Sequence, residues 1–210
     1  MNSIQKKILV RIRILGAGKI HTSKDFLDLG HRAAVDQALS RLAAHKTIRR
    51  LGRGLYYVPR MNSTLGIALA PDMDAVAQAI ARKTGSRVVP SGAVAANWLE
   101  LSPQVPAKPV YLTDGKSRSI RVGGTVFTMK HVSPRDLPLG SPKSAMVFQA
   151  LRYLGKESIS EATITHLRKR LPAADQRKLR KDLWCATGWI AEVVRKVCKS
   201  ANCSGAAHHG

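Results

Sequence analysis

The chain has 210 residues, enough for one large domain or two small ones, and an apolar fraction of 44% excludes wholesale disorder. Lysine and arginine total 35 against 13 acidic residues, and the net charge of +22 favours a polyanionic partner such as nucleic acid. Three cysteines argue against a secreted disulfide scaffold. Arg11 and Arg13 interrupt the first apolar stretch, and no apolar run reaches membrane-spanning length, so we expect a cytoplasmic protein with no membrane partner.

The first 60 residues are the most densely charged part of the chain. They carry a net charge of +10, whereas the remaining 150 residues carry +12. Apolar residues at helical spacing predict a helix over residues 4–15, which ends at Gly16 and Gly18. A short strand at 20–22 and a short helix at 24–29 follow. Ser23 is the expected N-cap of that second helix, and Gly30 makes the turn after it.

A third helix is predicted over residues 31–45, because apolar residues recur there at the spacing of one helix face. That buried stripe consists of Val35, Ala38, Leu39 and Leu42. The opposite face carries Ala33, Gln37, Ser40 and Ala44, with Asp36 and Arg41 on its flanks and Arg32 in the first turn. Small residues allow close approach to the major groove, where glutamine pairs with adenine and arginine with guanine. The alternative is that residues 31–45 form an ordinary surface helix whose polar face only meets water.

Two strands over residues 47–51 and 55–58 are predicted to form a hairpin through Gly52-Arg53-Gly54. Arg49 and Arg50 lie on the incoming strand and Arg53 lies at the tip. A basic hairpin directly after three helices is typical of a wing, which lies along phosphates or in the minor groove. The predicted DNA-binding residues are Arg32, Ala33, Asp36, Gln37, Ser40, Arg41, Arg49, Arg50, Arg53 and Tyr56.

The rest of the chain predicts a mixed second domain. We expect a winged helix-turn-helix domain over residues 1–60, a linker over 61–71, a C-terminal domain over 72–199 and a disordered tail over 200–210. The second domain is expected to hold helices at 72–83, 92–99, 142–154, 161–171, 174–183 and 188–198, and strands at 88–89, 110–113, 119–122 and 125–130. Asp72 and Ser141 are the expected N-caps of the first and third of these helices, and Gly123-Gly124 is the expected hairpin turn. The fold class is therefore α+β, with a winged helix-turn-helix followed by a small antiparallel sheet and C-terminal helices.

No motif indicates catalysis. Paired carboxylates and a P-loop are both missing from the sequence, so we expect no enzymatic activity and no cofactor. Residue types that bind zinc gather near the C-terminus, but their loose spacing favours a disordered tail over a metal site. These residues are Cys198, Cys203, His208 and His209. Cys185 lies in an apolar helical pattern and is expected in a core. Trp184 and Trp189 could stack on bases, but the apolar residues near them favour a core role for both.

A second basic segment lies near the C-terminus. It is either a solvated helical surface or a second polyanion contact, to flanking DNA or to RNA. Its residues are Arg168, Lys169, Arg170, Arg177, Lys178, Arg180 and Lys181.

Two long stretches carry a family resemblance. The first is "RAAVDQALSRLAAHKTIRRLGRGLYYVP", which resembles the N-terminal winged helix of AbiEi-type antitoxins of bacterial type IV toxin–antitoxin systems. The second is "SRVVPSGAVAANWLELSPQVPAKPVYLTDGKSRSIRVGGTVFTMKHVSPRDL", which resembles the second domain of the same family. Together they extend the resemblance over roughly residues 3–195. By position, it assigns DNA-binding roles to Arg32, Gln37, Ser40 and Arg41 on the recognition helix and to Arg49, Arg50 and Arg53 on the wing.

The resemblance implies a transcriptional autorepressor and antitoxin. Its N-terminal domain would bind double-stranded operator DNA, and its second domain would counter a nucleotidyltransferase-like toxin. We expect a homodimer on an inverted repeat, because one such unit reads only a short site. A stand-alone regulator whose second domain senses a ligand or dimerises is one alternative. An RNA-binding or RNA-processing protein is the other.

Overall fold

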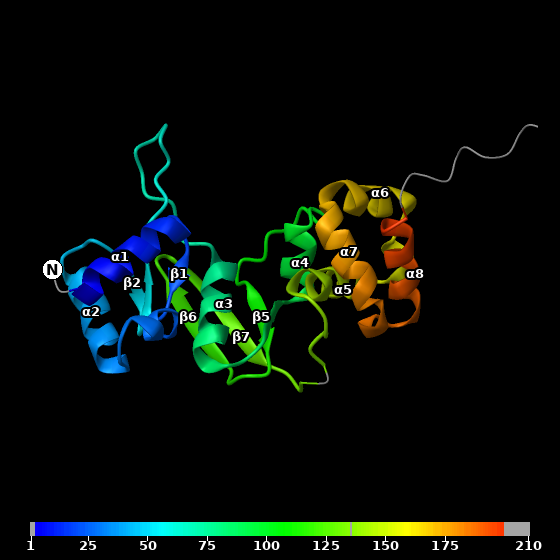
Figure 1. Cartoon of the computed structure of the whole chain (residues 1–210). Coiled ribbons are helices and arrows are strands. Elements are labelled where there is room, and N and C mark those ends of the chain that lie inside the picture. Colours follow the sequence, from blue (N-terminus) through cyan, green and yellow to red (C-terminus); the bar gives the residue numbers. More distant parts are fainter. Residues whose placement is uncertain (1–2, 135, 200–210) are drawn as a thin grey trace, which may run out of the picture. The chain divides into compact units, whose positions relative to one another are not determined.

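The computed structural model describes residues 3–134 and 136–199 (Figure 1). The predicted tail, with Cys203, His208 and His209, lies outside the described residues. Small antiparallel sheets are followed by C-terminal helices, which confirms the predicted α+β class. Two compact units divide the chain. Unit 1 comprises residues 1–88 and 113–131, and unit 2 comprises residues 89–112 and 132–210.

Unit 1 begins with helix α1 (Ser3–Leu15), the 3₁₀ helix η1 (Ser23–Leu29) and helix α2 (Arg32–Ala44). They enclose a core in which Ile8, Phe26 and Val35 are completely buried. Thr22, rather than the predicted Ser23, precedes η1, and its backbone N–H donates to the Asp25 carboxylate at 2.7 Å. The Ser23 hydroxyl is instead hydrogen-bonded to a carboxylate on α2, which removes it from the cap.

A three-stranded antiparallel sheet completes the N-terminal segment. Strands β1 (Ile20–His21), β2 (Arg49–Gly52) and β3 (Leu55–Tyr57) have the order β1-β3-β2. The hairpin β2–β3 pairs residue 50 with 56 and residue 52 with 55, so the register shifts just before the turn. Three helices followed by this hairpin are consistent with the predicted winged helix.

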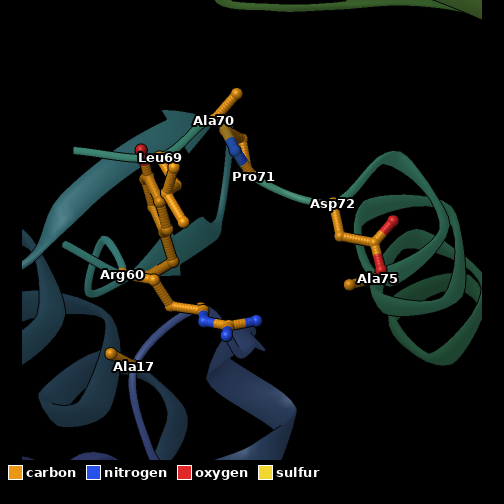
Figure 2. A pocket seen from close by; sticks show the side chains of 9 residues that line it. Ala17, Arg60, Leu69, Ala70, Pro71, Asp72 and Ala75 are labelled. Carbon is orange, nitrogen blue, oxygen red and sulfur yellow. The ribbon is translucent and has the colours of Figure 1, made fainter. Parts of the chain in front are cut away.

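The predicted linker is an ordered loop. Met61 and Ala68 pair as an antiparallel bridge, and the Asn62 backbone N–H donates to the carbonyl of Ile67 at 2.9 Å. Residues 61–68 project from unit 1 as a narrow hairpin (Figure 1). Where the chain returns, residues 69–72 help to line a cavity of about 180 Å³, and Figure 2 shows Arg60 among its lining residues.

Helix α3 (Met73–Thr84) packs within unit 1. The Asp72 carboxylate caps its start by accepting the N–H of Asp74 at 2.9 Å, as the sequence predicted. Near its end, Arg82 donates to the carbonyl of Ile20 in β1 at 3.0 Å. Lys24 of η1 donates in turn to the Arg82 carbonyl at 3.5 Å. These bonds tie α3 to the N-terminal segment.

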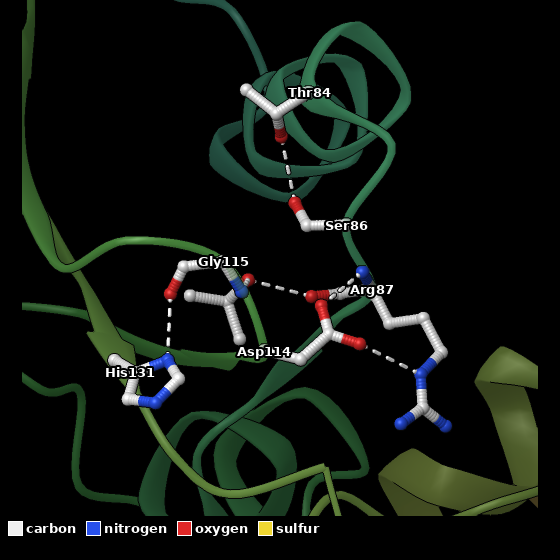
Figure 3. Close-up of polar contacts among 7 residues, drawn as sticks. Thr84, Ser86, Arg87, Asp114, Gly115 and His131 are labelled. Carbon is white, nitrogen blue, oxygen red and sulfur yellow. Dashed lines mark hydrogen bonds and ion pairs between the residues drawn. The ribbon is translucent and has the colours of Figure 1, made fainter.

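A polar network adds residues 113–131 to unit 1 (Figure 3). The Asp114 carboxylate accepts the backbone N–H of Arg87 at 2.7 Å and its Nε at 3.0 Å. The Thr113 hydroxyl donates to the Arg87 carbonyl at 2.7 Å, and His131 is hydrogen-bonded to the Gly115 carbonyl at 2.9 Å. Burial alone would raise the pKa of Asp114, but the bonds from Arg87 lower it, so the carboxylate stays ionised.

The units therefore differ from the predicted boundaries at 61–71 and 72–199. Residues 72–88 and 113–131 belong with the N-terminal segment, because α3 and the network above bind them to it. Strands β6 (Arg118–Val122) and β7 (Thr125–His131) form an antiparallel hairpin at the predicted Gly123-Gly124 turn. With β4 (Val88–Pro90) and β5 (Val110–Thr113) they give a four-stranded sheet of order β4-β5-β7-β6.

Unit 2 is mainly helical. Its helices are α4 (Gly92–Trp98), α5 (Pro142–Leu154), α6 (Glu161–Arg170), α7 (Ala173–Lys181) and α8 (Gly188–Val197), with 3₁₀ turns η2 (Lys156–Ser158) and η3 (Asp182–Cys185). A Cβ at Gly92 would lie 2.4 Å from that of Tyr153, so the close packing of α4 on α5 requires glycine there. None of the helices in the described residues is long and apolar enough to span a bilayer.

His21 is a buried titratable group in the core of unit 1. It is 1% exposed, and its Nε2 has no hydrogen-bond partner within the described residues. Burial lowers its pKa to about 4, with Asp25 opposing the shift and Lys19 and Arg82 adding to it. The folded protein therefore holds this imidazole neutral at any pH near neutrality.

Acidification should destabilise the protein through His21. The unfolded imidazole has a pKa of about 6.5, so between that pH and about 4 the unfolded chain binds a proton that the folded chain does not. The free energy of unfolding should fall across this window as the pH is lowered, by up to about 3 kcal/mol. Urea titrations at several pH values test this. His21→Phe should lose this part of the pH dependence and exposed His45→Gln should keep it. Equal slopes in all three proteins would contradict the prediction.

Candidate nucleic-acid interface

Helix α2 presents the predicted polar face to solvent. The stripe of Val35, Ala38, Leu39 and Leu42 is buried as the sequence predicted, which turns the opposite face outward. Ala33, Gln37, Ser40 and Arg41 are all exposed. In the part of the chain that the structure describes, the side chains of Gln37, Ser40 and Arg41 make no hydrogen bond or ion pair. They are therefore available to a ligand.

Asp36 positions a neighbouring arginine. Its carboxylate accepts the Nε–H of Arg32 at 2.9 Å and is also hydrogen-bonded to the hydroxyl of Ser23 in η1. Burial alone would raise the pKa of Asp36, but these two hydrogen bonds and the nearby charges of Arg32 and Lys83 lower it. The ionised carboxylate holds Arg32 at the start of α2. The sequence predicted Asp36 as a DNA contact, but its carboxylate is already hydrogen-bonded to Ser23 and Arg32 within the protein.

Tyr56 does not lie at the predicted surface. It is 5% exposed and packs in the core of the N-terminal segment. All three residues of strand β3 are buried, and the Tyr56 ring packs against the core residues of α1, η1 and α2. Tyr56 therefore has no free surface for nucleic acid.

The arginines of the hairpin β2–β3 are exposed as predicted. Arg49 and Arg50 lie on β2, and Arg53 lies at the turn. The Arg50 side chain donates from Nε to the carbonyl of Gly52 at 3.2 Å, which bends it toward the tip. Three cations thus lie on one short hairpin.

The tip of this hairpin is bound to α3. The Lys83 ammonium in the last turn of α3 donates to the carbonyl of Arg53 at 2.5 Å. Gly54 makes this approach possible: its φ is +69°, and a Cβ there would lie 3.0 Å from the Lys83 Nζ. Lys83 therefore braces the turn and brings its own charge to the tip.

Four cations from separate parts of the sequence gather around this brace. Burial lowers the pKa of Lys83, and the charges of Arg53, Arg32 and Arg118 lower it further. We call these four residues the cation cluster. Asp36 is the opposing charge near Lys83. Repulsion among the four would be relieved by a polyanion such as a phosphate backbone.

Two members of the cation cluster were missed from the sequence. Lys83 belongs to α3 and Arg118 begins β6, so both lie in segments expected to form another domain. Nothing in the local pattern of either segment distinguishes these residues from other surface cations. Only the packing of α3 and residues 113–131 in unit 1 identifies them.

Three residues of the second basic segment have partners inside the protein. Arg168 donates to the carbonyl of Lys196 at 2.7 Å, at the C-terminal end of α8. Arg170 pairs with Glu100 at 3.2 Å, and Lys178 lies 4.0 Å from Asp175. The remaining four are exposed, and among the described residues no ion pair involves them. They are Lys169, Arg177, Arg180 and Lys181.

The expected core placement of Trp184 is wrong. Its side chain is 72% exposed, whereas its neighbour Cys185 and Trp189 pack against the core of unit 2 as expected. Trp184 lies at helical spacing from the exposed residues Arg177, Arg180 and Lys181, which places it on the solvent side of α7 and η3. No group of three or more His, Cys, Asp or Glu side chains suited to a metal occurs in the described residues.

If the cation cluster contacts the phosphates of duplex DNA, removing the Lys83 charge should weaken binding to duplex DNA of any sequence. Lys83→Gln should lower the slope of log affinity against log salt by about one unit, because one phosphate contact is lost. Exposed Lys7→Gln on α1 removes the same charge elsewhere and should leave the slope unchanged. Fluorescence anisotropy over a range of salt concentrations measures both. If the slope were the same in both variants, Lys83 would only brace the hairpin.

No curated protein matches the chain. A family model described as a family of unknown function, DUF6088, matches residues 7–179, which extends from within α1 to within α7. That description states no activity, ligand or partner. Because the match spans most of the sequence, the chain belongs to the DUF6088 family.

Proposed function

We propose that this chain is a sequence-specific duplex-DNA-binding repressor. The observation that carries the proposal is the solvent face of α2, which is small, polar and free of internal partners, beside the cation cluster. Such a helix suits the major groove, and flanking cations suit the phosphates on either side.

Each exposed residue of α2 has a chemical role in this proposal. Ala33 has no bulk to hold the helix away from the base edges. Gln37 can pair with adenine through two hydrogen bonds, and Arg41 can pair with guanine O6 and N7. Arg32, held by Asp36, lies where the start of a recognition helix approaches a phosphate.

The hairpin β2–β3 acts as the wing. Arg49, Arg50 and Arg53 contribute through phosphates or the minor groove, so they supply affinity that depends little on sequence. Lys83 fixes the tip of the hairpin relative to α3, which reduces the conformational entropy that the hairpin loses when DNA binds. Two copies on an inverted repeat would give the specificity that a single short site lacks.

The resemblance to AbiEi-type antitoxins supports a narrower form of the proposal. In it, the protein represses its own operon and counters a nucleotidyltransferase-like toxin. A stand-alone regulator of other genes would have the same DNA surface and no toxin partner. An RNA-binding protein would prefer structured RNA to a duplex of equal length, and competition between these two probes tests that alternative.

Replacing Arg41 should reduce sequence discrimination. Arg41→Ala should cost roughly 1–3 kcal/mol on cognate DNA and much less on random DNA if the side chain makes a bidentate guanine contact. The cognate site is first selected from a random-sequence library with the full chain. Arg13→Ala removes an exposed arginine from α1 and serves as the control. Equal losses on both DNAs would reduce Arg41 to a phosphate contact.

DNA binding and toxin protection should separate genetically. The full chain carrying Gln37→Ala and Arg41→Ala should fail to repress but still restore growth when it and a neighbouring toxin are expressed from unrelated promoters. Repression cannot protect in that arrangement, so rescue reports antitoxicity alone. Loss of rescue in the variant would place antitoxicity on α2. Failure of the parent chain to rescue would favour the stand-alone regulator.

A further inference from the structure

Helix α7 and the turn η3 form one amphipathic segment in unit 2. Leu179 is 1% exposed and Leu183 packs against the core, so both face inward. On the same side, the Gln176 amide donates to the carbonyls of Arg168 and Leu171 at 2.9 Å each. The opposite side of the segment faces solvent.

That solvent side combines cations with an aromatic ring. Four exposed residues lie there at the spacing of one helix face: Arg177, Arg180, Lys181 and Trp184. We call them the α7 outer stripe. Along a helix it extends for about 10 Å. Trp184 is 72% exposed, so core packing accounts for little of its indole.

The acidic residues of this segment do not neutralise the stripe. Asp182 is turned inward, where it accepts the backbone N–H of Ser141 at the start of α5 at 2.8 Å. Asp175 is half-buried and lies nearest Lys178, which is not part of the stripe. The exposed surface of α7 and η3 is therefore cationic with one projecting ring.

We propose that the α7 outer stripe binds single-stranded nucleic acid, with a base stacked on Trp184 and phosphates held by Arg177, Arg180 and Lys181. An aromatic ring stacks on any base whose face is free, and the face of a base within a duplex is covered by its neighbours. Cations alone would suit a duplex equally well. The exposed indole beside them favours an unpaired strand.

This site is independent of α2 and the cation cluster, which belong to unit 1. The experiment uses the full chain with Trp98→Phe and Trp189→Phe, which leaves Trp184 as the one tryptophan of the three. Arg32→Ala and Arg53→Ala are added to weaken the duplex site. The probes are short oligouridylate, oligothymidylate and a mixed-sequence duplex.

We expect both single strands to quench Trp184 fluorescence and the duplex to quench it much less. Trp184→Ala should weaken single-strand binding, measured by anisotropy, roughly five- to hundredfold, while Trp184→Phe keeps most of the affinity. Replacing Arg177, Arg180 and Lys181 by alanine should lower the salt slope by about two units. The control replaces Lys6, Lys7 and Arg13 by alanine, which removes the same charge from α1.

Three outcomes would overturn the proposal. Trp184 fluorescence could stay unchanged at saturating single strand, or Trp184→Ala could bind as tightly as its parent. Duplex could also quench Trp184 as strongly as single strand, which would make the stripe a second duplex contact. Because 72% of the side chain is in solvent, Trp184→Ala should fold, and its circular dichroism checks this.

Discussion

The bond between the Lys83 ammonium and the Arg53 carbonyl is the contact on which the candidate interface depends. It fixes the tip of the β2–β3 hairpin to the end of α3. The turn favours glycine at position 54, because its φ is +69° and a Cβ there would lie 3.0 Å from the Lys83 Nζ. Without the bond from Lys83, the hairpin arginines would lie on a free turn, and α3 would contribute no charge to the surface around α2.

This arrangement brings the four positive charges of the cation cluster near one another, and they repel. Burial lowers the pKa of Lys83, and the charges of three arginines lower it further, so the cationic form of this lysine is disfavoured there. Asp36 offsets part of that repulsion, yet it is also held by Ser23 and Arg32. The repulsion among these cations is relieved most by a bound anion that carries several negative charges along its length. A nucleic-acid backbone has that property, whereas a single small anion would meet only part of the cluster.

Unit 2 distributes its charge differently. Its arginines and lysines are divided between structural partners, such as the carbonyls at the end of α8, and an outer stripe on α7 that has none within the described residues. The inward turn of Asp182 toward α5 produces this separation. Basic residues in one segment of sequence can thus serve opposite purposes, and charge density alone does not distinguish them.

The sequence by itself determined the elements and their faces. Helical periodicity located α2 and its buried stripe, Asp72 and Ser141 marked the starts of α3 and α5, and Gly123-Gly124 marked a hairpin. These features depend on local geometry, on backbone hydrogen bonds near a cap and on one side of a helix meeting a core. The exposed residues of the candidate interface on α2 and β2 follow from the same local rules.

Only the tertiary structure decided which elements belong together. It placed α3 and residues 113–131 with the N-terminal segment, which brought Lys83 and Arg118 to Arg53 and Arg32. It buried Tyr56 in the core formed by α1, η1 and α2. These results depend on contacts between residues far apart in sequence. Such contacts leave no signal in the local periodicity, since periodicity records which side of an element is covered and not what covers it. Trp184 is different, because its spacing from Arg177, Arg180 and Lys181 already places it on the outer side of α7 and η3, although its apolar neighbours predicted a core.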